Sequence, residues 1–180
     1  KDKRVALLIE DDYQEMEAWY PFYRLTEAGA EVTVIGPGTK TTFASKLGYE
    51  MDATLAIKDA RVADFDAVVV PGGFAPDHMR LHRPMIDFVR DMDKAGKLCA
   101  AICHGGWILV SAGLVDGRTM TSWPTLRDDI INAGGDWVDS EAVVDGNWVS
   151  SRKPDDLPAF NQKMLDLLQQ KQAGTLQGRR

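Results

Sequence analysis

Residues 98–106 read Leu98-Cys99-Ala100-Ala101-Ile102-Cys103-His104-Gly105-Gly106, a short apolar run that ends abruptly in Cys-His-Gly-Gly. Residues 107–110, Trp-Ile-Leu-Val, then begin a pattern with helical spacing. We therefore expect a buried strand that leads into a sharp turn, with Cys103 at the apex of that turn. Small residues on both sides let the backbones approach closely, as they do where a strand-to-helix turn presents a nucleophile.

The two cysteines of the chain have different expected roles. A thiol at a helix N-terminus feels the positive end of the helix dipole, and a neighbouring imidazole stabilises the thiolate, so we expect a lowered pKa for Cys103. Cys99 lies inside the strand without polar neighbours and is expected to be inert core. A disulfide between Cys99 and Cys103 would close no long loop, so we expect no structural disulfide and favour a reducing, cytoplasmic location.

The composition is that of an ordinary globular protein. The 180 residues suit one compact domain, of which 44% are hydrophobic and 27% charged. A formal net charge of -6 argues against nucleic acid or an anionic membrane as a partner. No apolar run approaches the length of a membrane span, and residues 1–4 lead into an expected strand rather than a signal peptide.

Strands and helices alternate along the first half of the chain. We expect buried strands at residues 4–9, 31–35, 65–70 and 97–102. Their mostly continuous apolarity is typical of parallel strands that are covered on both faces. Helical spacing follows Gln14 and Pro84, and the intervening residues 41–60 predict a hairpin-like excursion from the sheet. This pattern favours a three-layer α/β sandwich with helices on both faces of a mostly parallel sheet.

The second half has shorter elements. We expect a short strand at residues 118–121, a helix at 125–132, and a hairpin of 137–145 with 147–151 around Asp145-Gly146. A final helix begins at Pro154 and carries an apolar side to Leu168. Residues 1–172 are therefore predicted to form a single domain, and residues 173–180 a polar, frayed tail.

Three junctions that suit a site follow strands of the expected sheet. They are residues 10–17 after the first strand, Pro71-Gly72-Gly73 after the strand at 65–70, and Cys103-His104. In parallel α/β sheets, sites form at the carboxyl ends of the strands. We therefore expect these three junctions to meet at one edge.

Several motifs occur in an order that is typical of one family. They are Ala101-Ile102-Cys103-His104-Gly105, Pro71-Gly72-Gly73 with Ala75-Pro76-Asp77, Thr121-Ser122-Trp123-Pro124, and residues 144–152, Val-Asp-Gly-Asn-Trp-Val-Ser-Ser-Arg. Over residues 4–168 the chain resembles the PfpI-type intracellular cysteine peptidases. That group belongs to the class I glutamine-amidotransferase-like superfamily, with the parkinsonism-associated protein deglycase. The resemblance implies a flavodoxin-like sandwich with a cysteine nucleophile elbow.

The resemblance also implies roles for individual residues. Cys103 would be the nucleophile and His104 its base and thiolate partner. Asp77 would orient His104 from a neighbouring subunit of a homo-oligomer, although the family commonly has glutamate at this position. The alternative for Asp77 is an acidic residue that suits the N-terminus of a short helix after Pro76.

Other residues are expected to support the thiol. Glu17 stands at the position of the acid that hydrogen-bonds the nucleophile in the deglycase branch, with Glu15 as the near alternative. A protonated carboxyl that donates to sulfur would favour the thiolate. The amides of Gly73 and His104 would form an oxyanion hole. His78 and His82 are four residues apart, but without a third ligand we expect no metal, and no cofactor is indicated.

Two classes of function follow. The first is a stress-related cysteine hydrolase in which the Cys103 thiolate attacks a carbonyl of a peptide, a glycated protein or a small dicarbonyl such as methylglyoxal. The second is a non-hydrolytic sensor or chaperone in which Cys103 is oxidised to sulfinic acid. The adjacent His104 favours the enzyme.

Overall fold

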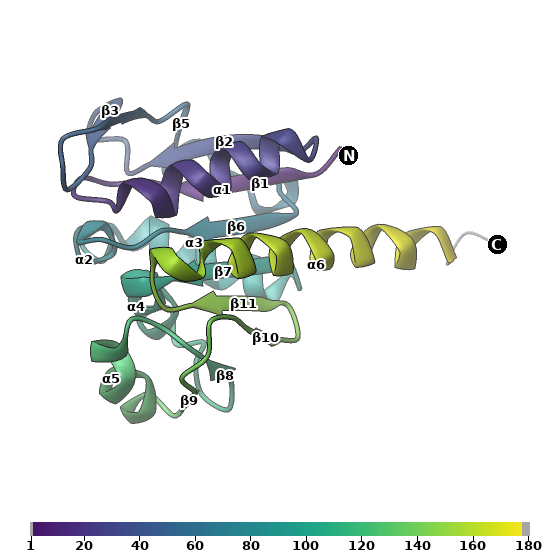
Figure 1. The fold of residues 1–180 in the computed structure, drawn as a ribbon. Coiled ribbons are helices and arrows are strands. Elements are labelled where there is room, and N and C mark those ends of the chain that lie inside the picture. The colour runs from purple at the N-terminus through teal and green to yellow at the C-terminus, as the bar shows by residue number, and fades with distance from the viewer. Residues whose placement is uncertain (1, 178–180) are drawn as a thin grey trace.

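The computed structural model describes residues 2–177, with side-chain surroundings through residue 170. Its centre is a sheet in the order β10-β11-β7-β6-β1-β2-β5 (Figure 1). The bounds of these strands are β1 Arg4–Leu8, β2 Glu31–Gly36, β5 Leu55–Ala56, β6 Ala67–Val70, β7 Leu98–Ile102, β10 Val143–Asp145 and β11 Trp148–Ser151. Every neighbouring pair is parallel except β10 with β11, so the predicted mostly parallel sheet is confirmed.

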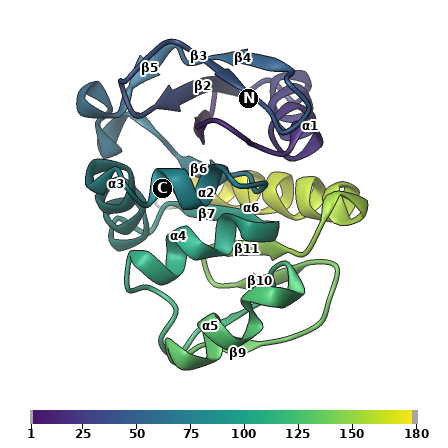
Figure 2. The same cartoon turned by 90° about the vertical axis from the view of Figure 1, so that its left-hand side faces the viewer.

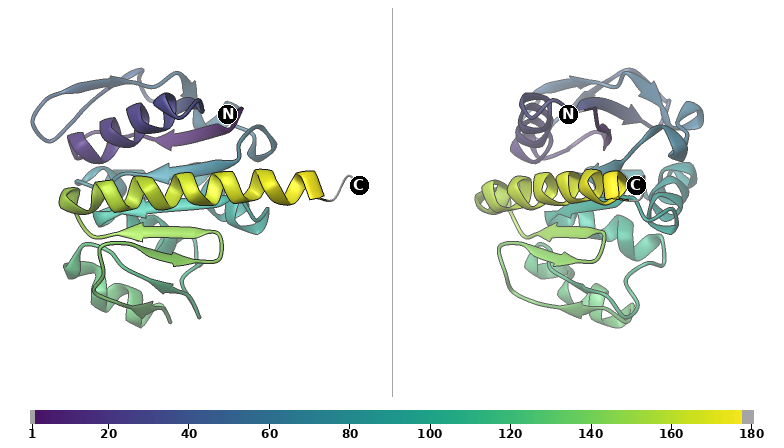
Figure 3. Two further views of the ribbon diagram at one scale, coloured as in Figure 1. Left: turned by 45° about the vertical axis from the view of Figure 1, so that its right-hand side comes forward. Right: turned by 90° about the vertical axis from the view of Figure 1, so that its right-hand side faces the viewer.

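Helices cover both faces of this sheet. Helices α1 (Glu15–Glu27) and α6 (Leu157–Gln177) pack on one face, and α3 (Arg83–Lys94) and α4 (Gly106–Ser111) on the other (Figure 2). The short α2 (Ala75–Met79) lies between β6 and α3 along the chain. The two further views in Figure 3 show the same layers. The expected three-layer sandwich is therefore confirmed.

Burial explains why these segments adopt these structures. All residues of β6 and β7 are buried, which is possible only for apolar strands covered on both faces. Helix α3 begins with Pro84 in its first turn and buries Met85, Phe88, Val89 and Met92 on one side. The sequence pattern thus explains why these strands are covered on both faces and which side α3 turns to the core.

Two smaller sheets lie outside the main one. The predicted excursion is a hairpin of β3 (Thr42–Ala44) and β4 (Glu50–Asp52). The expected hairpin at 137–151 is correct only around Asp145-Gly146, where β10 meets β11. Trp137 belongs instead to β9 (Asp136–Trp137), which pairs in parallel with β8 (Thr119–Met120). The intervening residues 138–142 are largely polar and half-buried or exposed, and therefore do not extend the strand.

The remaining helices are short or lie at the C-terminal end. Helix α5 spans Arg127–Asn132, and single 3₁₀ turns are η1 Ile57–Asp59, η2 Val62–Asp64, η3 Cys103–Gly105, η4 Pro124–Leu126 and η5 Pro154–Asp156. The backbone of α6 continues to Gln177, and residues 178–180 lie outside the described part. The division into a domain of residues 1–172 and a frayed tail of 173–180 stays a prediction. In the described part of the chain, no helix is both long and apolar enough to cross a membrane.

Candidate active site

The three expected junctions meet at one edge of the sheet. Strands β1, β6 and β7 are parallel neighbours, so their carboxyl ends lie together. The backbone N–H of Gln14, at the N-cap of α1, donates to the Gly72 carbonyl at 3.1 Å. Tyr13 also forms an isolated bridge with Gly73. The loops after β1 and β6 are therefore held against the turn that carries Cys103.

Cys103 lies at the apex of the turn between β7 and α4, as predicted. Its φ of 60° places it in the left-handed region, which costs a non-glycine residue about 1–2 kcal/mol. This backbone conformation folds the chain back sharply, and the Cys103 Sγ atom lies 3.3 Å from Nδ1 of His104. The side chain of Cys103 is 7% exposed. Adjacent residues can therefore act as a pair here because the backbone is strained.

Glu17 brings a carboxyl group to the same point from α1. Its side chain is fully buried, and its Oε1 accepts the Gly72 amide at 3.0 Å. The carboxyl lies within range of the Cys103 thiol, yet Oε2 has no hydrogen-bond partner of good geometry among the described residues. Glu15, the alternative, instead accepts the Leu47 amide at 2.7 Å. The structure therefore favours Glu17 as the neighbour of the thiol.

Gly72 and Gly73 let the chain pass close to both side chains. A Cβ atom at Gly72 would lie 2.5 Å from Oε1 of Glu17 and 2.8 Å from the Cβ of Cys103. Gly73 has a φ of +80°, and a Cβ there would collide with the Asp12 carbonyl. The sequence placed the Gly72-Gly73 pair at the site but gave a role only to Gly73. The signal was a glycine pair after a buried strand, which does not say which glycine approaches the acid.

The backbone amides of Gly73 and His104 both donate toward the Cys103 sulfur, and each lowers its pKa. Burial and the charge of Glu17 outweigh them and raise the pKa of the thiol to about 12. This direction is opposite to the one expected from the sequence, because a short turn in a water-poor site supplies less stabilisation than burial removes. The described site thus has its donors in place around a sulfur that holds its proton.

Burial also raises the pKa of Glu17 to about 7. Two acidic groups in contact inside a low-dielectric site cannot both ionise without a large cost. The Glu17–Cys103 pair therefore keeps at least one proton near neutral pH, and that proton can lie on either group.

His104 is half-buried and bordered by aromatic rings. Trp123 stacks near its imidazole with centroids 6.1 Å apart, Trp107 lies at 5.0 Å and Phe74 at 6.5 Å. Burial, and to a smaller extent the charge of Lys46, lowers the pKa of His104. The imidazole is therefore neutral at pH 7, and is suited to accept a proton from the thiol rather than to stabilise a thiolate as a cation.

Asp77 is not part of this arrangement within one chain. It is exposed on α2, and among the described residues its carboxylate makes no hydrogen bond or ion pair. His104 likewise has no carboxylate partner in the described part of the chain.

The two histidines considered as a metal pair are each bound to a different carboxylate. His78 contacts Asp12 at 3.0 Å and His82 contacts Glu10 at 2.9 Å. Within residues 2–177, no cluster of three or more His, Cys, Asp or Glu side chains is placed to hold a metal ion.

Comparison with known proteins agrees with this geometry. Residues 3–167 match the DJ-1/PfpI family. The chain belongs to that family. It is 45% identical over 165 residues to a deglycase of Pyrococcus abyssi, which covers 92% of this chain and 99% of the relative. It is 43% identical over 165 residues to deglycase PfpI of Pyrococcus furiosus, and this match covers 92% of this chain and 99% of that relative.

A solved structure gives the same result for the fold. The crystal structure of Drosophila melanogaster DJ-1beta matches with a TM-score of 0.85 at 28% identity, over 91% of this chain and 89% of that one. The family and the fold predicted from the motifs are therefore confirmed, and this member of the DJ-1/PfpI family has its cysteine at the strand-to-helix turn.

Proposed function

We propose that this chain is a cysteine hydrolase in which Cys103 attacks the carbonyl carbon of a glycated protein or methylglyoxal adduct, with a peptide bond as the second substrate class. One observation carries the proposal. The left-handed Cys103 brings its sulfur to 3.3 Å from a neutral imidazole while two amides point at the same atom. Relatives at 43–45% identity that are named deglycases support it.

Each group has a defined part in the proposed chemistry. Nδ1 of His104 accepts the thiol proton as the sulfur forms a bond to the carbonyl carbon. The carbonyl oxygen takes up the electron pair and accepts hydrogen bonds from the Gly73 and His104 amides. With a peptide substrate, the imidazolium returns its proton to the departing amine, and water then cleaves the acyl thioester. Glu17, when protonated, donates to the sulfur and limits the negative charge in the buried site.

We infer that the working enzyme is a homo-oligomer in which Asp77 of one subunit orients His104 of another. The exposed carboxylate of Asp77 and the lack of an acid beside His104 support this inference.

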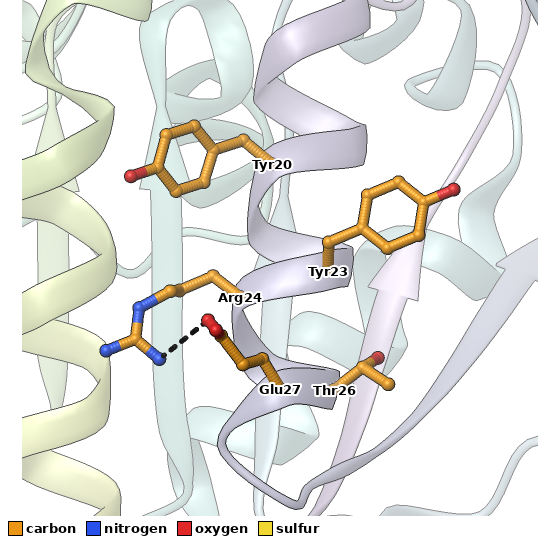
Figure 4. A pocket seen from close by; sticks show the side chains of 5 residues that line it. All are labelled: Tyr20, Tyr23, Arg24, Thr26 and Glu27. Carbon is orange, nitrogen blue, oxygen red and sulfur yellow. Dashed lines mark ion pairs between the residues drawn. The ribbon is translucent and has the colours of Figure 1, made fainter.

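Exposed apolar side chains on α1 offer a surface for such assembly, with Met16 60% and Tyr23 61% exposed. Tyr20, Tyr23 and an Arg24–Glu27 ion pair of 3.6 Å border a hollow of about 680 Å³ there (Figure 4). A cytoplasmic location remains part of the proposal.

A substrate panel tests the function directly. Purified protein is assayed with methylglyoxal, with a methylglyoxal-modified peptide and with an unmodified peptide, each beside Cys103→Ala. We expect turnover that falls at least about 10³-fold in the variant, the scale set by loss of a nucleophile. Equal activity of the variant would overturn the proposal. Peroxide-dependent oxidation of Cys103 without turnover of any substrate would instead favour the sensor.

Subunit mixing tests Asp77 separately. Cys103→Ala and Asp77→Asn are each expected to be inactive or nearly so as pure oligomers. If Asp77 acts between subunits, co-refolded mixtures regain activity because some sites combine an intact Cys103 with an intact Asp77 from the neighbour. Full activity of pure Asp77→Asn would remove this residue from the site.

A further inference from the structure

The hairpin tip at residues 45–48 is fixed beside the site by backbone hydrogen bonds. The Lys46 amide donates to the Tyr13 carbonyl at 2.9 Å. The Leu47 amide donates to Oε1 of Glu15 at 2.7 Å. Tyr13 is fully buried and bridges both Ser45 and Gly73. The backbone of Lys46 therefore has a defined position relative to the amides that face Cys103.

The side chain of Lys46 extends from this point toward the site. Its Nζ lies 5.4 Å from the centroid of the Phe74 ring, and that ring lies 6.5 Å from His104. Phe74 is 56% exposed, so this cation and ring face solvent together. No ion pair within 4.0 Å neutralises Lys46 among the described residues. After burial, its positive charge contributes to the lowered pKa of His104, and it opposes the rise that burial causes in the pKa of Glu17.

A second cation lies over another ring that borders His104. The Arg80 guanidinium is 5.4 Å from the Trp107 ring, which borders the imidazole. The carboxylates on the nearby loops are partly engaged: Asp12 with His78, Glu10 with His82, and Glu15 with the Leu47 amide. Asp77 is the exposed acid on α2. Two of the three aromatic rings that border His104, Phe74 and Trp107, therefore each have a cation over the ring.

We propose that Lys46 is a specificity-determining residue that attracts an anionic group of the incoming molecule, so that the site prefers carbonyl compounds bearing a carboxylate near the reacting carbon. Because Lys46 and the Phe74 ring face solvent, this attraction acts over about 8 Å at physiological salt and weakens as the salt concentration rises. This inference names the substrate class of the proposed hydrolase, and rests on that function only for its biological meaning. The recognition itself is a property of the thiol and its surroundings, and can be measured without turnover.

Paired alkylating reagents test the proposal. Iodoacetate and iodoacetamide transfer similar groups to sulfur with loss of iodide and differ mainly in charge. Rates at Cys103 are followed by mass spectrometry of its peptide at pH 8. The ratio of the iodoacetate rate to the iodoacetamide rate cancels any change in the thiol pKa, because both reagents need the same thiolate. We expect this ratio to fall about three- to tenfold in Lys46→Gln, as a single nearby charge predicts.

Matched variants separate a local from a general charge effect. Lys46→Arg should keep the wild-type ratio, since the charge remains. Lys94→Gln makes the same net-charge change at an exposed residue that ends α3, near the opposite end of the sheet, and should leave the ratio unchanged. High salt should reduce the difference between wild type and Lys46→Gln. An unchanged ratio in Lys46→Gln, or an equal fall in Lys94→Gln, would overturn the proposal.

A more reactive pair covers the case in which the buried sulfur alkylates too slowly to measure. Methanethiosulfonates carrying a sulfonate or a trimethylammonium group form a mixed disulfide with Cys103 and release methanesulfinate. The wild type should favour the anionic reagent, and Lys46→Gln should reduce that preference. A protein with this charge preference but no hydrolytic turnover would retain the inference and contradict the proposed function. A protein with hydrolytic turnover but without this charge preference would support the proposed function and contradict the inference about Lys46.

Discussion

Cys99 and Cys103 are four residues apart, one inside β7 and the other in the turn that follows it. Cys99 has extended backbone, is 1% exposed, and is paired in register with Val68 and Trp148. Its sulfur lies 3.9 Å from the Lys97 carbonyl oxygen, a long contact. Cys103 is almost as buried, yet a carboxyl, an imidazole and two amides surround it. Burial alone therefore does not distinguish a structural cysteine from a reactive one.

The two cysteines differ because polar groups lie near the ends of the strands and not within them. Cys99 is paired in register with apolar residues of β6 and β11, in a sheet that is covered on both faces. Cys103 lies where three strands end, so the chain can bring Glu17 from α1 and Gly72 from the loop after β6. Substitutions at Glu17, Gly72 and the two cysteines test this difference.

The largest expected effect is on the pH dependence of stability. Glu17 has a pKa of about 7 when folded against a model value of 4.5, so the folded state binds the extra proton and loses stability as pH rises between these values. That loss is up to about 3 kcal/mol. Chemical denaturation at pH 4.5 and pH 8 should show that Glu17→Gln gains this amount relative to wild type at the higher pH. The lowered pKa of His104 contributes with opposite sign in both proteins and cancels.

A difference between the two proteins that stays constant from pH 4.5 to pH 8 would mean that Glu17 ionises normally. Glu15→Gln serves as the control. Glu15 lies on the same helix turn, and although burial acts to raise its pKa, hydrogen bonds and the charge of Lys46 lower it overall, so this variant should gain no stability at the higher pH.

The second prediction concerns the space around the reactive cysteine. Gly72→Ala should destabilise the protein by about 2 kcal/mol and reduce turnover, because the new methyl group overlaps Glu17 and Cys103. Gly113→Ala is the matched control. It has a φ of +70° and no atom within 4 Å of its Cβ position, so it should cost about 1 kcal/mol with unchanged turnover. Denaturant melts and initial rates measure both, and normal turnover by Gly72→Ala would show that the site tolerates a wider loop.

The smallest effect separates the cysteines themselves. Cys99→Ser places a hydroxyl among apolar strands and should cost about 1 kcal/mol in stability with little loss of activity. Cys103→Ser should abolish turnover and change stability less, because donors and acceptors already surround that side chain. Melting curves should show the larger stability loss in Cys99→Ser, and rate measurements should show the larger activity loss in Cys103→Ser. Equal stability losses would show that the two surroundings are alike in polarity.

Much of the fold could be predicted from the sequence because its signals are local. Continuous apolar runs mark β1, β6 and β7, and glycines close α1 and α3. The parallel order of these strands then places Cys103 and the Gly72-Gly73 loop at one edge. The parallel pairing of β8 with β9 was missed, since two-residue strands carry no usable pattern.

The turn that carries Cys103 and the closeness of Glu17 agree with the sequence, the pKa of the thiol does not, and the roles of these residues stay predictions. The Cys-His pair and Glu17 follow from the motifs, but the raised pKa of Cys103 depends on burial that neighbouring elements create. The place of Lys46 depends on a hairpin that folds back onto Tyr13, a contact between distant parts of the loop region. The proposed role of Asp77 involves a second subunit and stays a prediction.

The buried Tyr13 links regions that are otherwise separate. Its hydroxyl donates to the Tyr49 carbonyl at 2.6 Å and accepts from Trp19 at 3.2 Å, while its backbone bridges the hairpin and Gly73. Opening the hairpin therefore also disturbs the loop that faces the thiol. In hydrogen exchange, the backbone amides of Lys46 and Gln14 should lose protection in one cooperative step. Opening of the hairpin and loosening of the loop that faces the thiol would then be one equilibrium.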